Sequence, residues 1–338
     1  MNGSMAEVAV TTLIEAPHAN GSTNRVAGLV DDAAGVSVPE RVKEEMKHGR
    51  ITQAAVAGEV GVSTSTLSMY LNDKYHGDVQ EIEAKVLRWL AARGERVQVR
   101  AVVPEPPRFF ASTTATEITN ALRYAQGLED MIAVAGVPGI GKSTTCDEYR
   151  RGQPNVWVAE AAAHTTGLVP ILKLICDAVG VPPLRGAVGA SGLAREIAAR
   201  VAKKRGLLII DEAHHIDLKA LDAIRALHDS TGVAIALVGG PPLLAKLESM
   251  PQLWSRIGIR LVRTRVQPGD VDAQLDAWGI ARADERKYLT SLAQGPGALR
   301  RVNKTLRLAG MLARDSAGVT LRHIQDAASS LSAHASDA

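Results

Sequence analysis

The pattern G-x-x-x-x-G-K-[ST] is filled at every fixed position by one continuous stretch of this chain. Its residues are Gly136, Val137, Pro138, Gly139, Ile140, Gly141, Lys142 and Ser143. The apolar run Met131–Ala135 stands directly before it and predicts a buried strand, so we expect a phosphate-binding loop between a strand and a helix. Glycines allow backbone angles that turn successive N–H groups toward phosphate oxygens, and the N-terminal end of the following helix attracts anions.

The last residues of this loop have specific expected roles. We expect Lys142 to reach the β and γ phosphates of ATP, and Ser143 to offer its hydroxyl to Mg²⁺. Thr144 completes the predicted nucleotide-binding set, which runs from Gly136 to Thr144. The alternative is a glycine-rich strand-to-helix turn that carries a lysine by chance.

A pair of acidic residues, Asp211 and Glu212, follows the apolar run Leu207–Ile210. A buried strand that ends in this pair would bring Asp211 to the metal ion and Glu212 to the attacking water. Asp211 and Ser143 are therefore the predicted Mg²⁺ ligands. The alternative is a strand that ends in a solvated acid pair.

Residues 211–214 also match the D-E-A-H box of helicases. Nothing else in the chain resembles the other helicase motifs or a second motor domain, so we do not infer a helicase. We expect His214 and His215 to be hinge or packing residues, because no third metal ligand stands near them.

Apolar runs alternate with helical patterns through the middle of the chain, which predicts a parallel sheet covered by helices on both faces. Further strands are expected over residues 156–159, 233–238 and 259–262, and helices over 115–126, 168–179 and 191–204. Four more helical segments follow at residues 271–277, 282–293, 298–313 and 320–331. We therefore expect a three-layer α/β core over residues 108–267 and a small helical lid over residues 268–338.

Residues 51–72 have the spacing of a helix-turn-helix and resemble that unit in phage repressors. Gln53 begins the first predicted helix, Ala57 is the small residue at the helix crossing, and Gly61 makes the turn. The residues expected to reach a DNA groove are Gln53, Ser63, Thr64, Ser65, Ser68 and Met69. None of them is Arg or Lys, so base specificity should be weak. The alternative is a helical hairpin that contacts another protein.

The expected helix-turn-helix domain spans residues 39–94 and ends in an amphipathic helix over 78–93. Prolines late in residues 95–107 predict a linker, and the small polar residues of 1–38 predict a disordered tail. A net charge of +3 is compatible with nucleic acid without requiring it. The two cysteines lack metal-site spacing and no apolar run is long enough to span a bilayer, so we expect a protein of the reducing cytoplasm.

In the order of these parts, the chain resembles the B transposition proteins of Mu-like phages over about residues 40–333. Members of that family are AAA+ ATPases with an N-terminal helix-turn-helix, and they are related to the ATPases of Tn7-like elements. The resemblance implies ATP, Mg²⁺, DNA-stimulated hydrolysis, and self-assembly on double-stranded DNA as a helical filament or ring. It also implies little sequence preference, capture of target DNA and activation of a phage transposase. Two rival functions stay open, an ATP-switched transcriptional regulator and a helicase loader.

The same resemblance assigns roles to three arginines. Arg300 stands where the lid arginine (sensor 2) of AAA+ proteins contacts the γ-phosphate, and Arg256 resembles the arginine finger that reaches a neighbouring subunit. Arg260 is the second candidate for the finger, and an ordinary surface arginine is the alternative. The predicted catalytic residues are thus Glu212, Lys142, Arg256, Arg300 and Arg260. The polar sensor 1 residue expected after the fourth strand is missing, because Gly239 and Gly240 stand there. Hydrolysis should therefore be slow, or another group positions the water.

Overall fold

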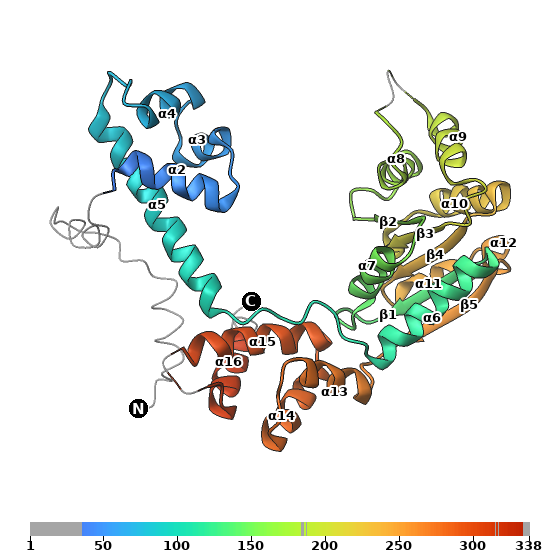
Figure 1. Ribbon diagram of the computed structural model, residues 1–338. Helices are drawn as coiled ribbons and strands as arrows, with labels where there is room; N and C mark the ends of the chain where they lie inside the picture. Colours follow the sequence, from blue (N-terminus) through green and yellow to red (C-terminus); the bar gives the residue numbers. More distant parts are fainter. Residues whose placement is uncertain (1–35, 184–185, 187, 315, 317, 334–338) are drawn as a thin grey trace. The chain divides into compact units, whose positions relative to one another are not determined.

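The computed structural model describes residues 36–183, 186, 188–314, 316 and 318–333 (Figure 1). The chain divides into two compact units. One contains the helices before Pro104 and the end of the chain from Leu308 onward, apart from Thr320–Ile324, and the other contains the remainder. Most of the tail predicted over residues 1–38 lies outside the described residues.

The N-terminal helices are α2 (Val38–Gly49), α3 (Gln53–Val60), α4 (Thr64–Leu71) and α5 (Val79–Val102). The predicted tail therefore overlaps the first helix, because Ser37 is its N-cap. Ser37, Thr52 and Ser63 cap α2, α3 and α4, and each side chain accepts a hydrogen bond from the backbone N–H three residues on. Gly61 ends α3 with a φ of 77°, a left-handed conformation that favours glycine. Local sequence thus sets both helices and the turn between them.

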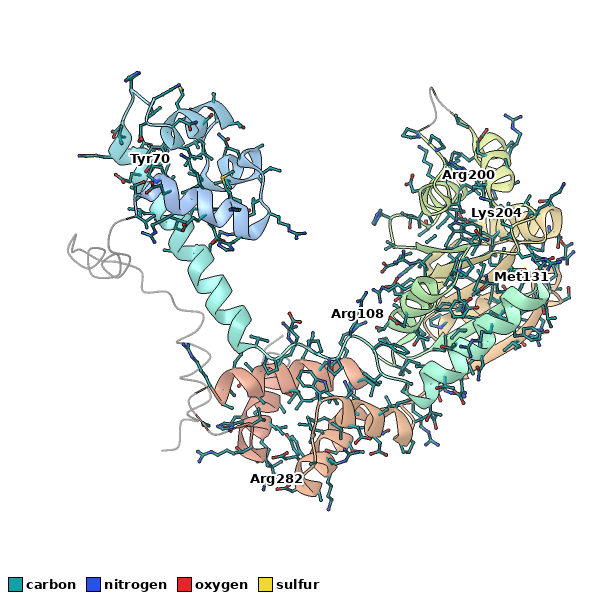
Figure 2. The ribbon with its side chains drawn as sticks, viewed as in Figure 1. Tyr70, Arg108, Met131, Arg200, Lys204 and Arg282 are labelled. Atoms are coloured by element: carbon teal, nitrogen blue, oxygen red, sulfur yellow. The ribbon has the colours of Figure 1, made fainter. Side chains whose placement is uncertain are left out.

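Apolar side chains from all four helices form the core of this N-terminal domain. The fully or almost fully buried ones include Val42, Val56, Ala57, Leu67, Leu71, Ile82 and Val86. Tyr70, labelled in Figure 2, is 6% exposed and packs in the same cluster. The apolar side of α3 and α4 is therefore the face that meets α2 and α5.

The last helix of this domain is longer than the sequence predicts. The amphipathic pattern predicts a helix over 78–93 followed by a linker, but α5 continues to Val102. A glycine inside a helix costs about 1 kcal/mol relative to alanine, so Gly94 alone does not end it. Pro104 is the first residue that cannot continue the hydrogen-bonding pattern. Of the linker predicted over 95–107, only residues 103–107 therefore lie outside the helix.

Five parallel strands form a sheet in the order β2-β3-β4-β1-β5. They are β1 (Met131–Gly136), β2 (Val156–Glu160), β3 (Leu207–Asp211), β4 (Ala234–Gly239) and β5 (Ile257–Arg263). Because β1 and β3 both pair with β4, the two predicted motifs stand at the carboxyl ends of the strands that flank it. Parallel α/β sheets bind ligands at this edge.

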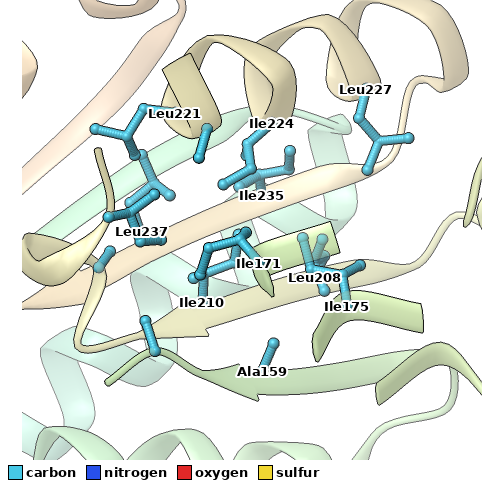
Figure 3. Packing of buried hydrophobic residues seen from close by; sticks show 14 of the residues in the cluster. Ala159, Ile171, Ile175, Leu208, Ile210, Leu221, Ile224, Leu227, Ile235 and Leu237 are labelled. Carbon is cyan, nitrogen blue, oxygen red and sulfur yellow. The ribbon is translucent and has the colours of Figure 1, made fainter. Parts of the chain in front are cut away.

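Helices cover both faces of the sheet. One face packs against α6 (Thr113–Leu128) and α7 (Lys142–Gly152), and the other against α8 (Leu168–Val179), α9 (Ala190–Val201), α10 (Leu218–Thr231), α11 (Pro242–Glu248) and α12 (Pro251–Trp254). Leu208 and Ile210 of β3 join one apolar cluster with Ile171 of α8 (Figure 3), whereas Ile209 belongs to the cluster of the opposite face. This alternation is the period of two expected of a strand covered on both sides. The structure confirms the predicted three-layer α/β core.

Four helices follow the sheet, α13 (Pro268–Ala277), α14 (Ala283–Ala293), α15 (Ala298–Leu312) and α16 (Leu321–Ala333). The boundary between the two units runs through α15 at Arg307. The fully buried Asp270 accepts hydrogen bonds from the N–H and the hydroxyl of Thr114, at 2.7 and 2.6 Å, so α13 is tied to the start of α6. In the part of the chain that the structure describes, no helix has both the length and the apolar character needed to cross a membrane.

Candidate nucleotide-binding site

The loop between β1 and α7 has the backbone geometry of a phosphate cradle. Gly139 and Gly141 have φ values of 87° and 94°, in the left-handed region where a side chain is strained. A Cβ on Gly139 would lie 2.1 Å from the carbonyl oxygen of Gly297, at the start of the lid helix α15, so this contact requires glycine. No side chain caps α7, which leaves its first N–H groups free for an anion.

Lys142 is a buried cation whose contacts are backbone carbonyls. Its side chain is 7% exposed, and Nζ donates to the carbonyl oxygens of Gly136 at 2.8 Å and Val137 at 3.2 Å. Burial lowers the pKa of Lys142, and the carboxylates of Glu212 and Asp211 act in the opposite direction. A desolvated ammonium is stabilised by an anion, and phosphate oxygens fit this requirement.

The strand β3 brings the acidic pair to the same edge of the sheet. Asp211 is 3% exposed, and its Oδ1 accepts a hydrogen bond from the N–H of Glu212 at 2.8 Å. Glu212 has a φ of 52°, rare for a residue with a side chain, and turns the chain into the short helix η2 (Ala213–His215). Ser143 is exposed at the start of α7. A hydroxyl and a carboxylate are oxygen ligands of the kind that Mg²⁺ uses beside substrate phosphates, so these residues fit the ion.

These groups meet at a cavity of about 570 Å³, a volume typical of small-molecule sites. Its lining includes Pro138, Gly139, Ile140, Gly141, Lys142, Ser143, Thr144, Glu212, His214, Gly240, Pro241, Leu299, Arg300 and Asn303. The predicted loop residues from Pro138 to Thr144 and Glu212 therefore come together with Arg300 of α15, whereas Gly136, Val137 and Asp211 are not among the lining residues.

A further wall of the cavity consists of residues 106–110, which sequence patterns place at the boundary between linker and core. It contains Phe109 and Phe110, the two phenylalanines of the whole chain. Arg108, which is labelled in Figure 2, precedes them in the same segment. Aromatic rings suit the flat apolar face of a nucleotide base. The adjacent pair in a chain with 3% aromatic residues is the signal that could have indicated this wall.

The three predicted arginines fall into two groups. Arg300 lines the cavity, at the position that the resemblance assigns to the lid arginine. Arg256 and Arg260 are absent from the lining: Nε of Arg256 donates to Oδ1 of Asp229 at 2.5 Å, and the guanidinium of Arg260 lies 4.0 Å from the ring centroid of Trp254. Both arginines therefore contact residues of their own chain outside the cavity, and their role as an arginine finger stays a prediction.

The end of β4 has no polar side chain, as the sequence predicts, and His214 lies beside it. The Nδ1 atom of His214 is 3.1 Å from the backbone nitrogen of Gly240 and 3.2 Å from Oε2 of Glu212. His214 also lines the cavity, whereas His215 does not. The packing role predicted for His214 is therefore incomplete, since this residue belongs to the site.

The predicted DNA-contact residues lie at the surface of α3 and α4. Thr64, Ser65 and Met69 are exposed, as is the capping residue Ser63, while Gln53 and Ser68 are half-buried. Nε2 of Gln53 donates to the carbonyl oxygen of Thr64 at 3.5 Å, so this side chain joins the two helices. The surface therefore presents short polar side chains and one thioether.

Residues 255–331 match the family model of the Mu B transposition protein, C-terminal part, and residues 125–247 match that of an AAA domain. The chain is 34% identical over 264 residues to the ATP-dependent target DNA activator B of Escherichia phage Mu. The matched region covers 76% of this chain and 83% of that protein. It is 31% identical over 273 residues to the Mu-like prophage FluMu DNA transposition protein B of Haemophilus influenzae, covering 78% and 93%.

Solved structures resemble the core of the chain. The ORC1 protein of Aeropyrum pernix in complex with DNA has a TM-score of 0.50 at 19% identity and covers 69% of both chains. Cdc6p of Pyrobaculum aerophilum also has a TM-score of 0.50, at 17% identity, and covers 63% of this chain and 64% of its own. At these identities the likeness shows the fold alone.

Proposed function

Because this chain belongs to the Mu B family of transposition proteins, we propose that it is an ATPase that assembles on duplex DNA and delivers that DNA to a phage transposase. The observation that carries this function is Lys142, a buried ammonium held by backbone carbonyls at the carboxyl edge of the sheet. A nucleoside triphosphate supplies the anion that this position favours. The names of the relatives supply the target DNA and the process of transposition, and the transposase is inferred from that process.

Nucleotide binding uses the phosphate loop, the end of β3 and residues 106–110. Lys142 exchanges its backbone carbonyls for β and γ phosphate oxygens, and the N–H groups at the start of α7 bind the same phosphates. Ser143 and Asp211 would hold Mg²⁺, which would supply positive charge against the triphosphate. The rings of Phe109 and Phe110 cover the base.

Hydrolysis requires a base and cations. Glu212 orients a water molecule toward the γ phosphorus and takes its proton, while the bond from the γ phosphorus to the ADP oxygen breaks and ADP and phosphate form. Arg300 offsets negative charge on the γ phosphate from the lid. A neighbouring subunit supplies a second cation through Arg256, with Arg260 as the next candidate.

Mixed assemblies test the contribution of the neighbour. Arg256→Ala subunits should bind ATP normally and hydrolyse it poorly, and mixing them with Lys142→Ala subunits should restore turnover. The rescue is expected because a Lys142→Ala subunit still offers Arg256 to the intact site beside it. Absence of rescue at every mixing ratio, in assemblies shown to contain both subunits, would contradict this role of Arg256.

Duplex DNA is the proposed partner of the α3–α4 surface as well as of the assembled ATPase. Side chains such as Thr64 and Ser65 can approach phosphates and bases, but they lack the bidentate donors of arginine. This composition supports binding with little sequence preference.

Binding to several unrelated duplexes of equal length, with ATP, with ADP and without nucleotide, tests the function as a whole. We expect ATP to promote binding to all of them alike and the protein to protect their full length from cleavage. A protected segment confined to one sequence would instead identify a transcriptional regulator. Capture of a replicative helicase in place of a transposase would identify a helicase loader.

A further inference from the structure

The space at the end of β4 is filled by a side chain from η2, the short helix that follows the neighbouring strand β3. Gly239 closes β4 and Gly240 follows it, so neither offers a side chain to the site. A Cβ on Gly239 would lie 3.2 Å from both the backbone nitrogen and Nδ1 of His214, and one on Gly240 would lie 3.5 Å from its Cε1. The imidazole thus takes the volume into which a β4 side chain would extend.

One nitrogen of this imidazole connects β4 to the acidic pair. The N–H of Gly240 donates to Nδ1 of His214 at 3.1 Å, and Oε2 of Glu212 lies 3.2 Å from the same atom. Nδ1 accepts from Gly240 when it carries a lone pair, and it donates to Glu212 when it carries the ring proton. The two hydrogen bonds exclude each other, because one ring nitrogen cannot accept and donate at once: the tautomer with its proton on Nδ1 holds the Glu212 carboxylate, and the other tautomer holds the end of β4.

The backbone that carries the ring is anchored separately. Nζ of Lys246 on α11 donates to the carbonyl oxygens of His214, at 2.5 Å, and Ile216, at 2.9 Å. The ring of His215 lies against that of His214, with centroids 4.1 Å apart. Burial of the ring and the proximity of His215 lower the pKa of His214, which favours the neutral ring at pH 7. A neutral ring on a fixed backbone is a hydrogen-bonding group of defined position.

We propose that His214 is a positioning residue for Glu212, and that it replaces the polar side chain absent from the end of β4. The ring limits the rotamers of the Glu212 side chain and so keeps the carboxylate at the cavity. A catalytic group displaced by about 1 Å can lose on the order of 10² in rate, so such a restraint matters for turnover more than for binding. This role rests on the proposed ATPase activity.

The test is steady-state ATP hydrolysis by the full-length protein and by His214→Ala, His214→Asn, His214→Gln and His215→Ala. Removing the ring should lower kcat by about tenfold to a hundredfold and leave KM for ATP within about twofold of wild type. Asparagine places a polar atom near the position of Nδ1, so His214→Asn should recover much of kcat, and His214→Gln should not. His215→Ala is the comparison variant: it removes the ring that lies against His214 but keeps Nδ1 of His214, so it should lower kcat by less than His214→Ala does.

Each contrary result has a distinct meaning. A wild-type kcat in His214→Ala would overturn the positioning role while leaving the ATPase function intact. Equal losses in His214→Ala and His215→Ala would show that η2 packing alone is responsible. Recovery by glutamine but not by asparagine would overturn the assignment to Nδ1. A wild-type protein that does not hydrolyse ATP would instead overturn the proposed function itself, and this measurement comes first.

Discussion

Alanine at Gly139 should weaken ATP binding by tenfold or more, for two reasons that the structure supplies. The φ of 87° lies in the left-handed region, where a residue with a Cβ pays roughly 1–2 kcal/mol. The added Cβ would also lie 2.1 Å from the carbonyl oxygen of Gly297, whereas ordinary contact begins at 3.4 Å, so the loop or the lid must move by about 1.3 Å, the difference of the two. A loss of about 1.4 kcal/mol is a factor of ten in affinity.

The assay is a titration of the full-length protein with a fluorescent ATP analogue, read for wild type, Gly139→Ala and Gly127→Ala. Gly127 lies in α6, where a Cβ would meet no other part of the fold within 4 Å and where φ is not left-handed, so it is the matched control. Gly127→Ala should bind the analogue normally and gain about 0.5–1 kcal/mol in stability, because alanine favours the helix. Wild-type affinity in Gly139→Ala would refute both the required left-handed bend and the contact of the lid with the loop.

Glu212→Gln should retain ATP and DNA binding but stop phosphate release, because an amide cannot take the proton of water; unchanged release would assign the base to another residue. Ser65→Glu, exposed on α4, should weaken DNA binding by repelling phosphates, whereas Ala91→Glu, exposed on α5, should not; equal losses in a gel-shift assay would mean that net charge alone matters. The hydrogen bond from Arg256 lowers the pKa of Asp229, so the contribution of this pair to stability is fully present above the unfolded-state pKa of Asp, about 3.9. That contribution is lost as the pH falls through the lower folded-state pKa. Arg256→Ala should therefore raise the midpoint of the Asp229 carboxyl titration followed by NMR, and an unchanged midpoint would show that the pair does not form in solution.

Structural elements that depend on residues close together in the sequence could be predicted from the sequence. The phosphate loop depends on an apolar strand, its glycines and one lysine within a few residues, and the turn at Gly61 depends on a cap and a glycine. The end of α5 was predicted too early, because Gly94 reads as a helix terminator although one glycine costs a long helix little. The stop comes instead from Pro104.

Contacts that arise only on folding could not be predicted. His214 and Gly240 are far apart in sequence and meet because β3 pairs with β4. Phe109 reaches the cavity because the segment before α6 passes beside the phosphate loop. Arg256 remains a prediction, since one chain contains no neighbouring nucleotide for it to reach.

The central claim is that phosphate contacts at Lys142 drive assembly on DNA. Its most direct measurement is the sedimentation of protein with unrelated duplex DNA before and after ATP is added, for wild type, Lys142→Ala and Lys173→Ala. Lys173 is exposed on α8 and carries the same charge, so it controls for the loss of one cation. We predict that ATP converts wild type and Lys173→Ala into large DNA-bound assemblies and leaves Lys142→Ala unassembled. Assembly of Lys142→Ala in response to ATP, to the wild-type extent, would contradict the account.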